Sequence, residues 1–237
     1  MVSEDGLERN AVLAALPADE LSRLSRDLDF TDARVRTQVY QPGDPIREVY
    51  FPLGSVFSMV GTTEDRVVVE VATIGREGMV GLPVFLGAAS TPHAAFCQIA
   101  GPAVKITAHS LRQVLADDGA LHAALNRFTQ ATMVQIAQNV VCNSTHVAIQ
   151  RAARWLLTTR DRVGADEFLL TQEFLGQMLG VRRPTASDTA RRLQAGGLIR
   201  YRRGTITITD AAGLQQAACS CYGIVKAEFD FITGNGQ

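Results

Sequence analysis

The sequence is poor in the residues that mark metalloproteins, disulfide-rich secreted domains and membrane proteins. Its 237 residues include four cysteines, four histidines and one tryptophan. No run of about eighteen apolar residues is present, and the polar segment from Met1 to Asn10 lacks the apolar core of a signal peptide. These absences predict a cytoplasmic protein with free thiols and no membrane span.

The spacing of the cysteines and histidines predicts no metal site. The cysteines, at positions 97, 142, 219 and 221, match no zinc or iron–sulfur pattern. Cys219 and Cys221 fall two positions apart in an expected helix, so their side chains should point to different faces. The histidines, at positions 93, 109, 122 and 146, are never closer than thirteen positions, which excludes the His-x-His pair of a cupin-like metalloenzyme. Phosphate-binding loops and nucleophile elbows are also missing, so we expect no enzyme and no resident cofactor.

The net charge of −1 hides an uneven distribution. Between Val147 and Gly213, eleven arginines and no lysine stand against six acidic residues, which gives this segment +5 and leaves −6 for the rest of the chain. An arginine-rich module on an acidic body is the layout of a nucleic-acid-binding protein. On charge alone, a solvated surface that uses arginine is the alternative.

The first half of the chain indicates short helices followed by a β-rich domain. Leucines recur at three- to five-residue steps from Asn10 to Leu28, and short β-branched runs between glycine and proline turns follow. These runs lie at 35–39, 49–52, 56–60, 67–74, 96–99 and 104–106, with a glycine-rich turn and a short helix at 76–89. They predict a closed or two-layer β structure of jelly-roll type, within an α+β protein.

A long helix is predicted from Asp117 to about His146, because this segment has no proline and its only glycine, Gly119, lies near the start. One face steps four, three, four and three residues, which is a heptad seam. The seam could pack against a second copy of the chain, or as a core helix against the β domain. Its residues are Leu121, Leu125, Phe128, Thr132, Gln135 and Asn139.

The segment after Leu170 has the pattern of a winged helix-turn-helix. Thr171 can cap a first helix, and Gly180 suits the left-handed position that ends it. Pro184 fits the first turn of a second helix, which Gly196 and Gly197 end. The residues at 198–209 read as a β-hairpin with a basic tip, which is a wing.

Basic and polar side chains on the second helix and the wing are the candidate DNA contacts. Arginines near the start of that helix can donate two hydrogen bonds to guanine in the major groove, whereas arginines at the wing tip suit phosphates. The alternative is a winged-helix module that binds another protein. The candidate residues are Thr171, Gln172, Arg182, Arg183, Thr185, Ser187, Asp188, Arg191, Arg192, Arg202 and Arg203.

The run from Leu170 to Thr185, with Arg191-Arg192-Leu193-Gln194 and Gly197-Leu198-Ile199, resembles the winged-helix domain of Crp/Fnr-type transcription regulators. The upstream order is similar too, with Gln41-Pro42-Gly43-Asp44 in a β-roll and a long helix after it. The resemblance implies a homodimer on a palindrome-like DNA site, with RNA polymerase as a further partner and no membrane. The recognition helix departs from the family pattern, because Pro184 stands at the usual acid and Asp188 at the usual second arginine. A half-site different from that of the cyclic-AMP receptor is therefore expected.

In the β-roll, the resemblance locates a candidate effector pocket without the usual cyclic-nucleotide ligands. Leu82 stands where the family has a glutamate, and His93 where it has an arginine, so cyclic AMP is not the expected effector. The candidate pocket residues are Arg76, Glu77, Gly81, Leu82, His93, Ala94 and Ala95. Another small molecule or nucleotide could bind there, or the sensor could be vestigial and DNA binding constitutive.

The expected organisation has three parts. Residues 1–116 form the β-roll sensor, 117–146 the dimerisation helix, and 147–237 the winged helix-turn-helix domain. A terminal helix from Gly213 to Phe231 is expected to pack on the DNA-binding domain.

Overall fold

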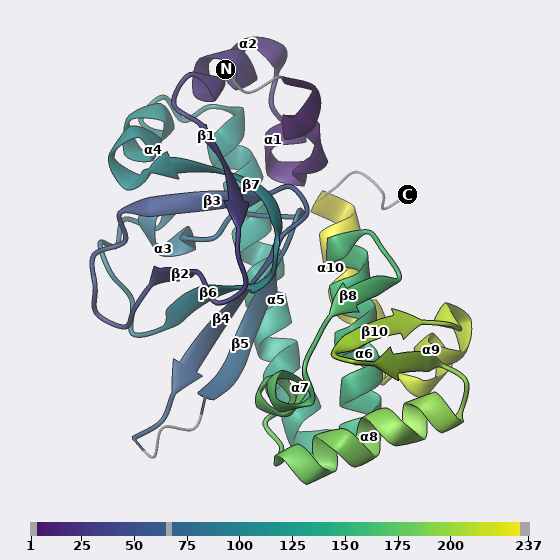
Figure 1. The fold of residues 1–237 in the computed structure, drawn as a ribbon. Helices are drawn as coiled ribbons and strands as arrows, with labels where there is room; N and C mark the ends of the chain where they lie inside the picture. Colours follow the sequence, from purple (N-terminus) through teal and green to yellow (C-terminus); the bar gives the residue numbers. More distant parts are fainter. Residues whose placement is uncertain (1–3, 65–67, 233–237) are drawn as a thin grey trace.

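The computed structural model describes residues 4–64 and 68–232 (Figure 1). Its N-terminal half is the predicted β structure, built from two antiparallel sheets with strand orders β1-β7-β3 and β2-β6-β4-β5. Val67, which we predicted to begin a strand, lies outside the described residues. The seven strands are β1 (Asp29–Ala33), β2 (Gln38–Tyr40), β3 (Glu48–Pro52), β4 (Val56–Thr62), β5 (Val68–Ile74), β6 (Ala94–Ile99) and β7 (Gly101–Thr107).

Apolar side chains fill the space between the two sheets. Phe51 on β3 and Phe57 on β4 are fully buried there, and they belong to a core that also takes in the N-terminal helices. Glycine at position 81 lets the backbone there lie close to Val49 of β3, because a Cβ atom on residue 81 would lie 2.5 Å from Cγ1 of Val49. The short helices around the sheets are η1 (Glu4–Arg9), α1 (Ala11–Ala14), α2 (Ala18–Ser25), α3 (Leu82–Phe85) and α4 (Ala108–Leu115).

The predicted long helix is α5 (Ala120–Thr145), which lies against the β-roll along its length (Figure 1). Glu20 of α2 caps its start, since the Glu20 carboxylate accepts hydrogen bonds from the backbone N–H groups of Ala120 and Leu121 at 3.0 and 2.8 Å. The helix ends at His146, whose backbone is extended, and α6 (Ala148–Val163) begins two residues later.

The C-terminal half contains the predicted winged helix-turn-helix. Its sheet has the order β8-β10-β9, and the domain has an apolar core of its own. Two β-roll residues, Val56 and Ile99, join that core, so the two halves of the chain pack directly against each other there. The elements are β8 (Glu167–Leu169), α7 (Gln172–Leu179), α8 (Arg183–Ala195), β9 (Ile199–Arg202) and β10 (Thr205–Ile208).

The predicted single terminal helix is in fact two helices, α9 (Ala211–Ala217) and α10 (Cys221–Ile232). The chain leaves the helical conformation at Ala218, whose backbone is extended. After this break α10 runs back along α5 and contacts α6, so that Val225 and Phe229 join the core of the β-roll half (Figure 1). The segment packs on the DNA-binding domain as expected, through Leu214 and Tyr222, and α10 packs on the β-roll half as well, which was not predicted. Within residues 4–64 and 68–232, no helix is both long and apolar enough to cross a bilayer.

Candidate nucleic-acid interface

The two helices of the candidate interface are fixed by the local signals seen in the sequence. The Thr171 hydroxyl accepts a hydrogen bond from the Phe174 N–H at 3.1 Å, which caps α7. Gly180 ends α7 with a left-handed φ of 61°, and Pro184 lies in the first turn of α8. The turn between the helices is therefore short, and it sets α8 across the end of α7.

The second helix, α8, has one buried face and one basic, exposed face. Ala186, Thr189, Ala190 and Leu193 are buried against the rest of the domain. The opposite face carries exposed Arg182, Arg183, Thr185, Asp188, Arg191 and Arg192. In Figure 1, α8 lies at the end of the molecule farthest from α2, with its outer face open. A helix with this exposed arginine face can enter a major groove.

Four of the candidate contacts form two hydrogen-bonded pairs in this structure. Nη1 of Arg191 donates to Asp188 at 2.9 Å, so the aspartate orients an arginine on the exposed face. Ser187 is half-buried, and its hydroxyl donates to Oε1 of Gln172 at 2.7 Å. Ser187 and Gln172 therefore brace α7 against α8, and either would have to leave its partner to contact DNA fully.

The wing is a tight hairpin with a basic tip. Arg203 and Gly204 form its two-residue turn with φ values of 51° and 80°, the left-handed pair that matches the twist of β9 and β10. Arg202 and Arg203 are exposed at this tip, as is Arg200 on β9, which the sequence analysis did not select. The wing is tied to α8, because the Tyr201 N–H donates to Oε1 of Gln194 at 2.7 Å. Neither Gln194 nor Tyr201 was predicted, since nothing in the local sequence pairs them.

The helix-turn-helix is docked on the four-stranded sheet of the β-roll. Phe174 of α7 meets Phe96 of β6 edge to face, with ring centroids 6.1 Å apart. Nε1 of Trp155 on α6 donates to Oε1 of Glu70 on β5 at 2.8 Å, and Ser58 donates to the same carboxylate at 2.8 Å. Burial raises the pKa of Glu70, against the smaller opposing effect of these hydrogen bonds.

A second polar contact joins the sensor to the C-terminal half near the end of α6. Nε of Arg162 lies 2.6 Å from Oε1 of Glu77, and both side chains are almost completely buried. The guanidinium also donates to Oε1 of Gln135 on α5 at 3.1 Å and lies 5.4 Å from the centre of the Phe229 ring. Arg162 thus links the β-roll, α5 and α10 at one point.

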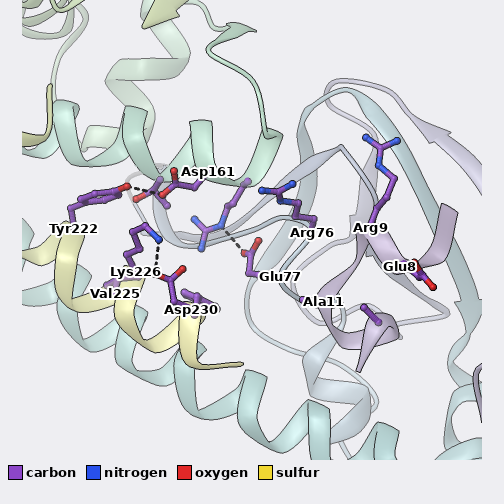
Figure 2. Close-up of a pocket in the computed structure, with 14 residues that line it drawn as sticks. Glu8, Arg9, Ala11, Arg76, Glu77, Asp161, Tyr222, Val225, Lys226 and Asp230 are labelled. Atoms are coloured by element: carbon purple, nitrogen blue, oxygen red, sulfur yellow. Dashed lines mark hydrogen bonds and ion pairs between the residues drawn. The ribbon is translucent and has the colours of Figure 1, made fainter. Parts of the chain in front are cut away.

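A pocket of about 470 Å³ opens beside this ion pair (Figure 2). Figure 2 shows Arg76 and Glu77 on one side, and Asp161 with Tyr222 and Lys226 on the other. Among the described residues, Oε2 of Glu77 and Nη1 of Arg162 are buried polar atoms without a hydrogen-bond partner. The remaining lining residues are Glu8, Arg9, Ala11, Ala14, Thr158, Val225, Phe229 and Asp230.

The structure divides the predicted effector residues between two places. Arg76 and Glu77 line the pocket just described, and none of the other five does. Gly81 and Leu82 lie at the start of α3, whereas half-buried His93 precedes buried Ala94 and Ala95 on β6. Of the seven residues, Arg76 and Glu77 are therefore the two that line this pocket.

The six predicted seam residues are all buried within the chain. Leu121, Leu125 and Phe128 belong to the β-roll core, and Thr132 is also buried. The amides of Gln135 and Asn139 donate to the carbonyls of Thr73 and Val71 at 3.2 and 2.9 Å. This face cannot meet a second copy in this structure, because it already packs on β5. For this face the structure therefore agrees with the alternative prediction, in which the helix packs against the β domain as a core helix.

Comparisons with known proteins agree with this geometry. Residues 150–217 match the family model described as the Crp-like helix-turn-helix domain. No curated protein sequence matches the chain. Several solved structures have its fold. FixK2 from Bradyrhizobium japonicum is 18% identical with a TM-score of 0.69, and the match covers 81% of this chain and 98% of that one.

Two further structures give similar values. The c-di-GMP responsive global regulator CLP from Xanthomonas campestris is 18% identical with a TM-score of 0.66, over 81% of this chain and 99% of that one. A transcriptional regulator of the CRP family from Thermus thermophilus is 17% identical with a TM-score of 0.63, over 79% and 96%. Residues 150–217 are thus a Crp-like helix-turn-helix domain, in a chain that has the fold of the Crp/Fnr-type transcription regulators.

Proposed function

We propose that this protein is a sequence-specific DNA-binding transcription regulator that acts as a homodimer on a palindrome-like site. The observation that carries the proposal is the exposed arginine face of α8, set beside a wing whose tip carries Arg202 and Arg203. The direct test is selection of bound fragments from sheared genomic DNA at moderate salt. A motif with two-fold symmetry supports the proposal, and an absence of binding at low salt overturns it.

Two arginines should have different roles on DNA. We expect Arg183→Ala to cost about 1–3 kcal/mol on the selected site and to relax preference at one base pair, because this arginine begins α8. Arg202→Ala should instead weaken binding to all sequences and reduce the salt slope by about 1. Affinity measured on matched and scrambled sites at several salt concentrations distinguishes the two.

The matched control for these variants is Arg34→Ala, which removes an exposed arginine from the sensor half and should leave DNA affinity unchanged. Equal weakening of matched and scrambled DNA by Arg183→Ala would contradict a base-reading role for Arg183.

The homodimer is proposed to form through the outer face of α5 rather than through the predicted seam. This outer stripe also steps in heptads, and it includes two apolar side chains, Met133 and Val140, that are 62% and 64% exposed. Val141 beside it is exposed as well. The stripe residues are Asn126, Gln130, Met133, Ala137, Val140 and Ser144.

A charge on this stripe should separate the dimer. We expect Val140→Glu to be monomeric in sedimentation velocity, and to lose about 10²-fold or more in affinity for a two-fold site, because a monomer cannot hold both half-sites. Leu86→Glu is the control, since Leu86 is similarly exposed but lies on the β-roll. A monomeric wild-type chain, or a Val140→Glu chain that stays dimeric, would refute the assignment of this interface.

The pocket between Glu77 and α10 is the proposed site of an effector. Its walls come from the β-roll, α6 and α10, so a bound molecule would touch both halves of the chain. A ligand that favours one arrangement of these halves shifts the population toward it, and so changes how α8 meets DNA. The fragment selection is therefore repeated with cyclic mono- and dinucleotides, including c-di-GMP, to which the Xanthomonas campestris regulator responds. Equal operator affinity with and without every tested compound favours a constitutive dimer.

A further inference from the structure

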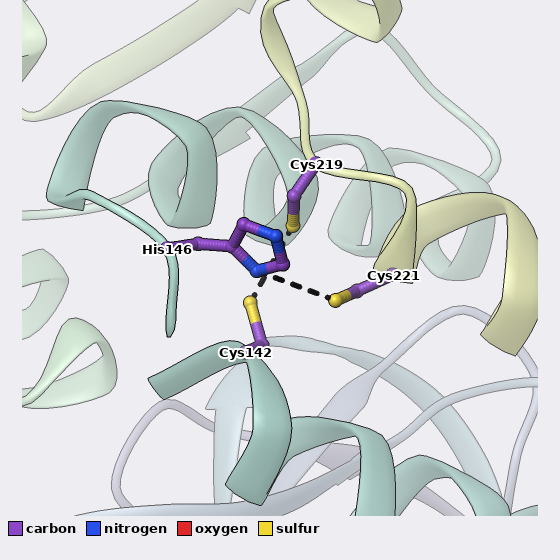
Figure 3. A group of neighbouring side chains, drawn as sticks. All are labelled: Cys142, His146, Cys219 and Cys221. Carbon is purple, nitrogen blue, oxygen red and sulfur yellow. Dashed lines mark hydrogen bonds between the residues drawn. The ribbon is translucent and has the colours of Figure 1, made fainter. Parts of the chain in front are cut away.

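Three of the four cysteines and one histidine meet at the joint between α5 and α6 (Figure 3). Cys142 lies near the end of α5, and His146 follows directly after that helix. Cys219 lies in the break between α9 and α10, and Cys221 is the first residue of α10. All four potential ligand atoms lie within 4.8 Å of one another.

The structure corrects our prediction that Cys219 and Cys221 point apart. That prediction assumed one continuous helix, but Ala218 is extended and α10 begins only at Cys221. Both thiols can therefore face the end of α5. On the other side, Cys142 and His146 are four positions apart, which puts them on one face of the helix end.

The distances suit one tetrahedral metal ion. Sγ of Cys142 is 3.5 Å from Sγ of Cys219, and Sγ of Cys221 is 3.6 Å from Nδ1 of His146. With Zn–S near 2.3 Å and Zn–N near 2.0–2.1 Å, a tetrahedron needs about 3.8 Å between two sulfurs and about 3.6 Å between sulfur and nitrogen. A disulfide would need the sulfurs at about 2.05 Å.

The chemistry of the four residues and their burial also point to a structural site. The three cysteines are at most 5% exposed and form a small cluster of their own, separate from the two apolar cores. Gln138 donates from Nε2 to Sγ of Cys221 at 3.0 Å, a contact of the kind that orients a metal-bound thiolate. Three sulfurs and one imidazole nitrogen form a complete four-ligand set, which is typical of structural zinc.

We propose that Cys142, His146, Cys219 and Cys221 bind one Zn²⁺ ion in a closed tetrahedral site. On binding, the three thiols release their protons to solvent and coordinate as thiolates, and no electron transfer is involved. The ion would fasten the break before α10 to the end of α5, next to the extended residues His146 and Val147 that join α5 to α6. It would therefore hold the angle at which α6 leaves α5.

The test uses the full-length chain, purified under reducing conditions without chelator. We expect about one zinc ion per chain by elemental analysis. Replacement by Co²⁺ should give the visible bands of a tetrahedral ion together with thiolate-to-cobalt charge transfer. Neither readout involves DNA, so this proposal and the proposed function can fail separately.

Matched variants locate the ion. Cys219→Ser and His146→Gln should each abolish stoichiometric zinc, whereas Cys97→Ser, at a buried cysteine of β6 outside the cluster, should retain it. The wild-type measurement needs no variant, so a variant that fails to fold does not weaken the test. A wild-type chain that takes up neither Zn²⁺ nor Co²⁺ overturns the proposal. A Cys142–Cys219 disulfide found by peptide mapping of the wild-type chain as purified also overturns it.

Discussion

Arg162→Ala is expected to lower the free energy of unfolding by about 3–5 kcal/mol, because it leaves the buried carboxylate of Glu77 without its cation. The substitution also removes the contacts of Arg162 with Gln135 and Phe229, so the β-roll, α5 and α10 lose a shared contact. Urea denaturation followed by circular dichroism measures the loss. The control is Arg160→Ala, since Arg160 pairs with Asp166 at the surface, where an ion pair contributes about 0–1 kcal/mol.

A double variant tests the cause of this loss. Arg162→Met with Glu77→Gln removes both charges and keeps an acceptor for the Gly75 N–H, which donates to Glu77 in the native chain. We expect the double variant to recover about 1–3 kcal/mol relative to Arg162→Met alone. If the double variant loses as much free energy of unfolding as Arg162→Met and Glu77→Gln lose together when measured singly, the buried charge is not the source of the effect.

Trp155→Ala is also expected to lower the free energy of unfolding by about 3–5 kcal/mol. Trp155 is 3% exposed, and its indole fills the space between α6 and the four-stranded sheet. Removal leaves a cavity there and deprives Glu70 of its Nε1 donor. The same denaturation experiment measures this loss, and the tryptophan fluorescence of the wild-type chain reports the transition, because the chain has only one tryptophan.

Trp155→Phe separates the cavity from the hydrogen bond. Phenylalanine keeps most of the volume and removes only the N–H, so we expect a smaller loss, about 1–3 kcal/mol. Phe231→Ala, at a ring that is 72% exposed, should be close to neutral. Equal losses for Trp155→Ala and Trp155→Phe would show that the hydrogen bond, not the packing, holds the two halves together.

The winged helix-turn-helix could be predicted in detail because its signals are local. Thr171, Gly180 and Pro184 each act within a few residues of their own position, and the structure confirms the cap, the left-handed turn and the helix start. The turn of the wing could likewise be predicted, because Gly204 follows Arg203 and favours the left-handed conformation found there. Such signals need no knowledge of what lies across the fold.

The sequence could not predict which element packs against each buried face. The heptad spacing from Leu121 to Asn139 shows that one face of α5 is covered, but it does not say whether β5 or a second chain covers it. The thiol cluster could not be predicted for the same reason. It joins residues 77 positions apart, and it depends on a break at Ala218 that no proline or glycine marks. The pairing of Glu77 with Arg162 spans 85 positions and is equally invisible.

The two contacts made by α6 bear on how this protein could be re-engineered. Trp155 and Arg162 lie two helical turns apart, and each donates a hydrogen bond to a carboxylate of the β-roll. A chimera cut at Val147 would carry both side chains onto a foreign sensor without Glu70 and Glu77. Grafts of this DNA-binding module should therefore transplant the two acidic positions together with the helix, or replace all four residues by apolar ones.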